Sequence, residues 1–288
     1  MTTEAETELP RGLALAWGVA AAPQRGPKRE MTVERIVEAA VEIADAEGLS
    51  AVSMAAVAAR LGYTPMSLYR YVSAKDDLVL LMQEEATGLP SEAVRSAADW
   101  REALECYYRE QVQSYLDHPW VLDVPITGMP ATPNSSAWVD AGLHALADTP
   151  LTIPERLAVI LLVAGLARWT GIVYAGYARA RRDGVGLTDA DVARREDALY
   201  RALITADAFP DLRAAVDAGV LLGDTDSFAY GLERSLDGVA ATIGARLDGV
   251  APVMPAVQED PTADIAADKR YREAQKAVRV AERALREA

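Results

Sequence analysis

The chain has 288 residues, and its 51% hydrophobic content is that of a globular protein with a core. Its formal net charge of −14 disfavours nonspecific wrapping by nucleic acid, and its single cysteine, Cys106, excludes an intrachain disulfide and favours a reducing compartment such as the cytoplasm. Alanine and leucine are abundant, whereas the alternation typical of strands is hard to find, so an all-α fold is predicted.

Residues 1–31 are predicted to be a flexible N-terminal extension. The segment starts with acidic residues, which a secretory signal does not, and ends in the basic stretch "QRGPKRE". Arg25, Lys28 and Arg29 have two interpretations, a disordered terminus or a basic arm that follows a nucleic-acid backbone. Three charges are too few to choose between them.

Two helices are predicted next, each between a capping residue and a glycine. Thr32 is a good N-cap for a helix that runs to about residue 47, where Gly48 ends it. Ser53 then caps a short helix that ends at Gly62.

A second short helix follows after a turn of about three residues. Thr64 is its predicted cap, Pro65 takes the favoured first position, and about seven residues are helical. Ser73 is the predicted cap of a fourth helix, with Asp76 and Asp77 in the first turn. Two short helices around a tight turn have helix-turn-helix geometry, in which the second can enter a major groove.

Charge is distributed unevenly around this turn. Residues 48–75 contain Arg60, Arg70 and Lys75 and no acidic residue, and residues 24–75 carry a net charge of +1. Apart from Glu30, the acids of this region fall in the first helix, which we expect behind the surface that meets DNA. DNA phosphates repel acids and attract exposed bases, so a nucleic-acid partner is favoured.

The rest of the chain reads as helices separated by prolines and turns. The predicted helices span residues 97–117, 135–148, 154–182, 188–206, 209–219, 225–248 and 263–287. The apolar run 157–178 has almost the length of a membrane span, but Arg168 at its centre is costly in lipid, so a buried helix and no membrane contact are expected.

The last predicted helix has apolar residues at 3-4-3-4 spacing: Tyr271, Ala274, Val278, Ala281 and Leu285. This pattern fits either a short coiled-coil seam or a helix folded onto its own body. The predicted parts of the chain are thus the extension 1–31, a helix-turn-helix domain 32–78, a helical regulatory and dimerisation domain 79–250, and a linker with a charged helix 251–288.

Residues 32–82, "TVERIVEAAVEIADAEGLSAVSMAAVAARLGYTPMSLYRYVSAKDDLVLLM", resemble the signature of the TetR family of transcriptional regulators. The segment "FAYGLERSLDGVAATIGAR" (228–246) resembles the last dimer helix of the subgroup closest to the tetracycline repressor. The resemblance implies a three-helix head, a larger helical ligand-binding and dimerisation domain, no cofactor and no enzymatic activity.

The resemblance also implies which residues meet DNA. Base edges would face Pro65, Met66 and Ser67, and phosphates would face Thr64, Tyr69 and Lys75. Leu68 and Val72 are expected to point inward, against Val57, Leu61 and Ile36.

Two positions depart from the family pattern. Tyr71 stands where the family often has His, and its hydroxyl can still contact a phosphate. Ala55 stands where many relatives have an Arg that contacts the backbone or a guanine. Arg70 or the arm at 25–29 could compensate, although Arg70 is also consistent with a plain surface charge.

A single short helix reads few bases, so a twofold dimer on a palindromic operator is expected. Helices 157–178 and 228–246 resemble the family's four-helix dimer interface. Small residues would allow close approach at Ala164, Gly165 and Gly171, and an apolar stripe runs along the second helix: Leu232, Leu236, Val239 and Ile243.

Relatives bind a small-molecule effector in the helical core. The candidate pocket residues are Trp100, Tyr108, Trp138, His144, Trp169 and Tyr174, although such aromatic residues are more often core. We expect His144 to be a hydrogen-bonded core residue and His118 to be a helix-end residue.

The predicted function is a sequence-specific DNA-binding transcriptional regulator, a repressor released from its operator by an effector. Two alternatives remain. One is a helical scaffold of TetR-like shape that reads no DNA, which Ala55 and the acidic charge favour. The other is an enzyme that uses only carboxylates, because no zinc spacing or nucleophile motif is found.

Overall fold

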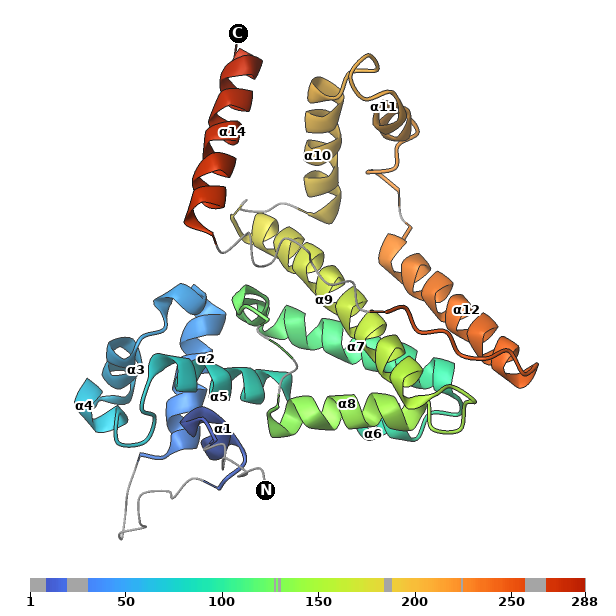
Figure 1. The fold of residues 1–288 in the computed structure, drawn as a ribbon. Helices are drawn as coiled ribbons and strands as arrows, with labels where there is room; N and C mark the ends of the chain where they lie inside the picture. The colour runs from blue at the N-terminus through green and yellow to red at the C-terminus, as the bar shows by residue number, and fades with distance from the viewer. Residues whose placement is uncertain are drawn as a thin grey trace. The chain divides into compact units, whose positions relative to one another are not determined.

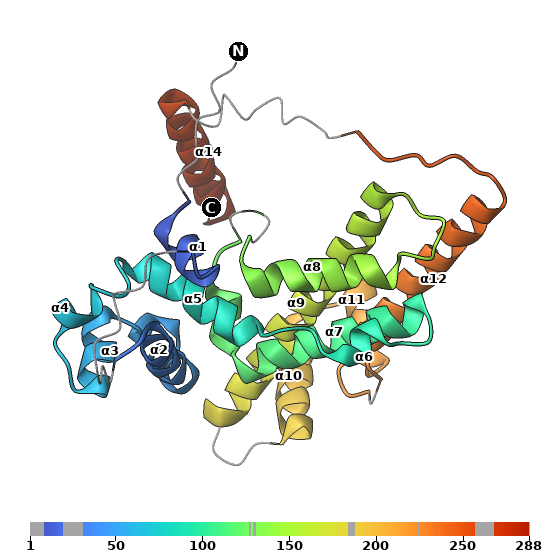
Figure 2. The ribbon, with the colours of Figure 1, turned by 90° about the horizontal axis from the view of Figure 1, so that it is seen from below.

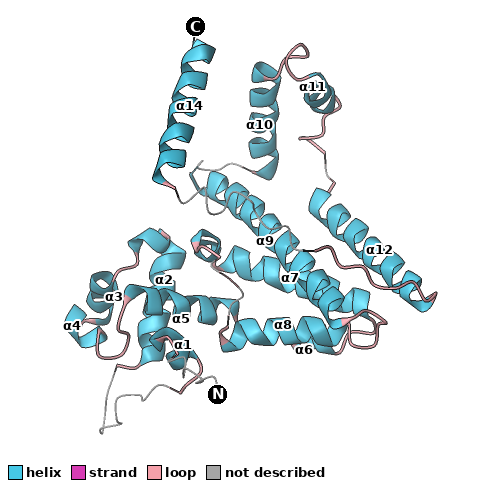
Figure 3. Ribbon diagram, viewed as in Figure 1, coloured by secondary structure: helices cyan, strands magenta, loops and turns pink. Residues whose placement is uncertain are grey.

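A computed structural model describes residues 9–19, 31–126, 128, 131–183, 188–223, 225–256 and 268–287. Every regular element within these ranges is a helix, which confirms the predicted all-α fold (Figure 3). The chain divides into two compact units, residues 1–250 and residues 251–288. The first unit contains an N-terminal head and a larger helical body.

The helices of the head begin and end close to their predicted limits. They are α2 (Val33–Glu47), the 3-10 turn η1 (Leu49–Ala51), α3 (Met54–Leu61), α4 (Pro65–Leu68) and α5 (Lys75–Thr87). The Thr32 hydroxyl accepts from the Arg35 amide, and the Ser53 hydroxyl accepts from the Ala56 amide. Gly48 and Gly62 end α2 and α3 with φ of 86° and 76°, a conformation that disfavours a side chain.

Of the other two predicted caps, Thr64 holds the N-cap position of α4 with Pro65 after it, but without a side-chain bond, and Ser73 is wrong. Thr64 precedes α4, but its hydroxyl bonds the Ser67 hydroxyl at 3.0 Å and caps no amide, and α4 has four residues, not seven. The N-cap of α5 is Ala74, because the Ser73 hydroxyl instead donates to Asp77 Oδ2 at 2.5 Å. The two acids in the first turn of α5 are confirmed.

The core of the head joins all of its helices. Side chains from α2, α3, α4 and the turn after it are fully buried in one cluster: Ile36, Val57, Leu68 and Val72. Leu61 is half-buried against the same cluster, so the predicted inward face of the head is confirmed. This packing fixes α4 from beneath and leaves its other side to solvent.

A helix that the sequence did not predict covers part of the head. Residues Arg11–Ala16 form α1, which lies along α5 (Figure 2). Gly12 is buried there, and a Cβ on it would lie 2.8 Å from Asp77 Oδ1 and 3.2 Å from Asp77 Cα. The Trp17 indole donates to the Ala131 carbonyl at 2.7 Å. The expectation of a flexible extension is therefore wrong for α1, whose stability comes from docking.

The body is a layered bundle, with α7, α8 and α9 packed side by side (Figure 1). Its helices are α6 (Glu92–Arg95), α7 (Trp100–Asp117), the 3-10 helix η2 (Pro119–Asp123), α8 (Pro133–Ala145), α9 (Ile153–Asp183), α10 (Asp189–Leu203), α11 (Pro210–Asp217) and α12 (Ser227–Leu247). Leu104, Ile160 and Leu236 are fully buried at the centre of the bundle.

Helix α9 is long and apolar enough to cross a membrane by length and composition alone, and 28% of its apolar window is buried. Its inner face packs in the body core. Arg168, at its middle, donates to the carbonyls of Leu122 and Val124 at 2.9 and 3.1 Å. The opposite face carries exposed apolar side chains, among them Leu162, Trp169 and Ile172. The prediction of a buried helix is thus correct for one face only.

The small and apolar residues predicted to meet a partner do not all face outward. Gly171 is packed against Tyr115, whose side chain lies 2.8 Å from the position of an added Cβ. Leu232, Leu236 and Val239 are buried against the protomer's own core. Gly165 is exposed with open space above it, as predicted. Periodicity alone could not tell which neighbour each face of α9 and α12 would contact.

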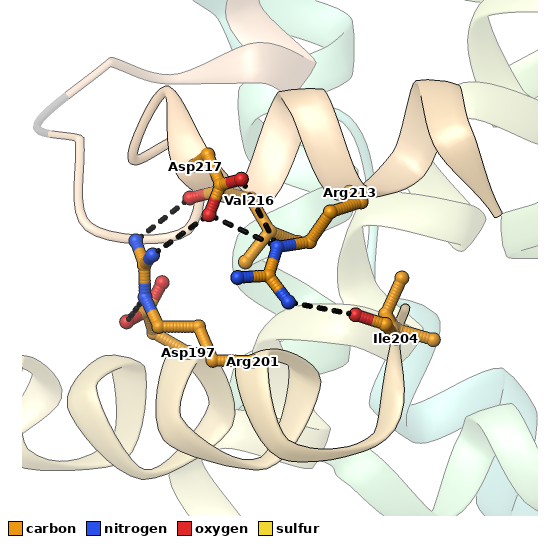
Figure 4. Close-up of polar contacts among 6 residues, drawn as sticks. All are labelled: Asp197, Arg201, Ile204, Arg213, Val216 and Asp217. Carbon is orange, nitrogen blue, oxygen red and sulfur yellow. Dashed lines mark hydrogen bonds and ion pairs between the residues drawn. The ribbon is translucent and has the colours of Figure 1, made fainter. Parts of the chain in front are cut away.

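An ionic cluster holds α10 and α11 together (Figure 4). Arg201 lies between Asp197 and Asp217, at 2.7 and 3.1 Å. Arg213 pairs with Asp217 at 3.0 Å and donates to the Ile204 carbonyl at 3.1 Å. These contacts replace the large apolar core that two short helices cannot form.

The second unit contains helix α14 (Lys269–Glu287). Its side chains are exposed wherever the structure describes them, including Tyr271 and Val278 of the predicted seam. The coiled-coil interpretation stays a prediction.

Candidate nucleic-acid interface

Helix α4 and the turn before it present the residues predicted to read bases. Pro65 is exposed, and Met66, with 73% of its surface exposed, is the most exposed large apolar side chain of the head. Ser67 is half-buried, with its hydroxyl bonded to Thr64. Leu68 anchors this helix while Met66 extends into solvent, where it can contact an apolar group such as a thymine methyl.

The residues predicted to contact phosphate lie on both sides of this helix. Tyr69 and Arg70 follow α4 and are exposed, and Lys75 is the exposed first residue of α5. Tyr71 is half-buried, with its ring packed against the head core. The head therefore offers a hydroxyl and two cations around α4.

The other predictions for this surface concern Arg60, Ala55 and the basic arm. Arg60, counted among the bases of the acid-free stretch, pairs with Glu42 of α2, so the acids of the first helix do not all lie away from this surface. Ala55 is exposed on α3 and offers no polar group. The predicted arm, Arg25, Lys28 and Arg29, lies outside the described residues.

The head is joined to the body through one carboxylate. Asp45 Oδ1 of α2 accepts from the indole of Trp120 at 2.7 Å and lies 2.9 Å from Nδ1 of His118. His118 is the predicted helix-end residue, but it also bridges two parts of the fold. An open cleft of about 820 Å³ lies beside this contact, lined by Trp120, Lys75 and Arg179 among others.

Helix α5 provides a second connection. The Glu84 carboxylate accepts from the Asn134 amide at the start of α8, at 2.6 Å. The Trp138 indole donates to the Gly88 carbonyl at 3.1 Å, and the Ser114 hydroxyl donates to the Ala86 carbonyl at 2.9 Å. A shift of α7 or α8 would therefore displace α5, the helix that begins with Lys75.

A polar cluster lies within the body between α7, α9 and α12. The hydroxyls of Tyr108 and Thr170 are 2.8 Å apart, and the Tyr174 hydroxyl donates to Asp226 at 3.1 Å. Burial and the Asp226 carboxylate raise the pKa of Tyr174 to about 12. The ring of Tyr174 meets that of Phe228 edge-on at 5.5 Å. Thr170 and Asp226 were missed by the sequence analysis, because their role depends on contacts between distant helices.

The candidate pocket residues do not come together around one cavity. Trp138 is buried edge-on against Tyr107, with ring centres 5.0 Å apart, in the cluster that also contains Tyr108. Trp100 is half-buried beside this cluster. His144 and Trp169 are exposed, so the expectation that His144 is a core residue is wrong. Both fall on outward faces of their helices.

Comparison with known proteins identifies the family to which this chain belongs. The family model described as "Bacterial regulatory proteins, tetR family" matches residues 36–82, and "Tetracyclin repressor-like, C-terminal domain" matches residues 94–243. The HTH-type transcriptional repressor DrrR1 of Streptomyces coeruleorubidus is 36% identical over 256 residues, which cover 87% of this chain and 92% of that protein. The chain belongs to the TetR family.

Two further likenesses agree. An HTH-type transcriptional regulator of Saccharopolyspora erythraea is 30% identical over 85% of this chain and 99% of its own length. The structure of apo ActR from Streptomyces coelicolor superposes with a TM-score of 0.59 at 24% identity, over 75% of this chain and all of that one, a likeness of fold. As a TetR-family protein the chain is a DNA-binding transcriptional regulator, and its family is one of regulators rather than enzymes.

Proposed function

We propose that this TetR-family protein is a cytoplasmic homodimeric repressor that leaves a palindromic operator when a small molecule binds its body. The observation that carries the proposal is the exposed surface of α4 and the residues after it, with no acid in the sequence from 48 to 75, fixed from beneath by Leu68 and Val72. A surface of cations and hydroxyls with one exposed apolar side chain is suited to a polyanion with apolar groups in its groove.

Each exposed residue of the head has a proposed role. Met66 and Ser67, with Pro65, contact base edges, which sets the sequence that is read. Tyr69 and Lys75 contact phosphates, which sets the position of the head on the duplex. We assign contacts with the DNA backbone to the other residues predicted to bind DNA: Thr64, Arg70, Tyr71 and the arm at 25–29.

The dimer is supported by the outward faces of α9 and α12. On α9 the exposed residues Leu162, Gly165, Trp169 and Ile172 follow 3-4-3 spacing along one side. On α12, Gly238 is exposed with open space above it. Apolar and small residues on one long face are what a four-helix interface between two copies requires.

The effector site is proposed at the polar cluster in the body. Tyr108 and Tyr174 were candidates from sequence, and with Thr170 and Asp226 they offer donors and acceptors among aromatic rings. ActR, which has a similar fold, has been solved in complex with (S)-DNPA and with actinorhodin. A ligand bound at this cluster would push α7, α9 and α12 apart. That movement would be transmitted to the head through the contacts of Asp45 and α5.

The test uses duplexes selected from a random library by the full-length protein. Lys75→Ala should reduce the slope of log affinity against log salt by about 0.9 for each head and weaken all sequences alike. Met66→Ala should instead change the preferred bases. Arg95→Ala, which removes a charge from α6 of the body, is the matched control and should leave DNA binding unchanged. Failure to select any duplex at low salt would favour the scaffold alternative.

A further inference from the structure

Helix α14 carries a positive charge that the rest of the chain lacks. Residues 269–287 contain seven Lys and Arg and three Glu, a net charge of +4, within a chain whose net charge is −14. Four of the basic residues recur at 4-3-4 spacing, which places them on one side of a helix. These residues, here called the basic face, are Arg272, Lys276, Arg279 and Arg283, and all four are exposed.

The other side of α14 is apolar but small. The sequence places five residues on it, of which two are Ala: Tyr271, Ala274, Val278, Ala281 and Leu285. The helix therefore separates its cations from its apolar residues. Its cations are the stronger feature.

We propose that the basic face of α14 contacts the phosphates of duplex DNA beside the segment that the head reads. This inference rests on the proposed function, because it needs the head to bring DNA near. The basic face extends about 17 Å at 1.5 Å per residue, and a duplex presents one negative charge per about 1.7 Å of its axis. A duplex segment of that length carries about ten negative charges, so the four cations of the basic face would neutralise fewer than half of them.

The chain between α12 and α14 allows this contact. Residues 248–268 separate the two helices and can span at most about 75 Å when fully extended. A tether of this length keeps a weak binding segment at a high effective concentration near DNA that is already held by the head. The contact adds affinity without adding base preference, because phosphates carry no sequence.

Other partners fit α14 less well. Helices that lie in a membrane surface use Trp, Phe or Leu on their apolar face, whereas this face has one Leu, Leu285, and no Trp or Phe. A coiled coil with a second copy would have Ala at alternate seam positions, which bury little area. Two acids of the first unit already have partners: Asp217 pairs with Arg201, and Asp237 pairs with Arg101.

The experiment compares full-length wild type with a variant whose basic face is neutral: Arg272→Gln, Lys276→Gln, Arg279→Gln and Arg283→Gln. Each is titrated with a selected operator duplex alone and with the same operator flanked by random sequence, between 50 and 200 mM salt. Wild type should bind the flanked duplex more tightly than the neutral variant. It should also lose up to about 150-fold more affinity over this range for each α14 that contacts DNA, at about 0.9 in slope for each of its four contacts. The variant should bind both duplexes alike.

The controls separate this inference from the proposed function. A variant that changes the three arginines of the basic face to Lys should keep the wild-type salt dependence. If the neutral variant matches wild type on the flanked duplex while Lys75→Ala still weakens binding, the role of α14 is refuted and the reading head stands. If wild type binds neither duplex, both fail. Loss of binding to phosphatidylserine–phosphatidylcholine vesicles, with DNA binding unchanged, would overturn the proposal in favour of a membrane surface.

Discussion

Removal of the Asp45 carboxylate should loosen the head from the body. Asp45→Ala leaves the Trp120 indole N–H without its acceptor, and Trp120 is only 2% exposed, so water cannot easily replace the lost bond. A buried donor without a partner costs about 1–3 kcal/mol. The His118 ring is partly exposed and can turn to water, so its contribution should be smaller. The expected loss in free energy of unfolding is therefore about 1–3 kcal/mol.

Denaturant unfolding of the full-length protein measures this loss, and hydrogen exchange at α2 and η2 localises it. Asp123→Ala is the matched control, because it removes a charge from the same cleft where Asp123 is exposed. That control should stay within about 0.5 kcal/mol of wild type. A loss for Asp45→Ala no larger than the control's would refute the view that this carboxylate holds the junction. Asp45→Asn, which keeps one acceptor, should lie between the two.

Three further predictions concern the head, its covering helix and the body. Leu68→Ala should lower the free energy of unfolding by about 2–5 kcal/mol, because Leu68 is fully buried. Met66→Ala, at an exposed position, should change it little. Equal losses would mean that α4 is not fixed from beneath. Gly12→Leu should release α1 from α5 and speed hydrogen exchange at residues 11–16, and Arg11→Leu, at an exposed position, should not. The Glu155 carboxylate accepts from an arginine of α12 and from its own helix start, which lowers its pKa from 4.5 to about 2. The stabilising effect of this carboxylate is complete above pH 4.5 and is lost as pH falls toward about 2. Glu155→Gln should therefore reduce the pH dependence of the free energy of unfolding in that window. An unchanged pH dependence would show that the pair of Glu155 and Arg246 does not stabilise the fold.

Local features of the fold could be predicted because their causes lie within a few residues. The caps at Thr32 and Ser53 and the glycines after α2 and α3 depend only on hydrogen bonds to neighbouring amides and on backbone conformation. The prediction that Ser73 caps α5 failed for a local reason too, because the Asp77 carboxylate accepts the hydrogen bond of its hydroxyl.

Features that depend on docking could not be predicted. The pair of Asp45 and His118 joins residues 73 positions apart, and no short pattern signals it. Helix α1 has no side-chain cap and is held by its contact with α5. For α9 the apolar period was clear, but both of its sides are apolar, so the period did not say that Gly171 faces Tyr115 within the protomer.

Arg168 gives the long apolar helix α9 a connection that its composition does not suggest. Its guanidinium donates to the carbonyls of Leu122 and Val124. Leu122 lies in η2, the 3-10 helix that carries Trp120, and Val124 follows it. The position of the Trp120 indole is therefore set from α9, while the carboxylate that the indole binds belongs to the head. A rotation of α9 about its own axis would move both carbonyls, so the orientation of the head depends on the helix bundle as well as on the head.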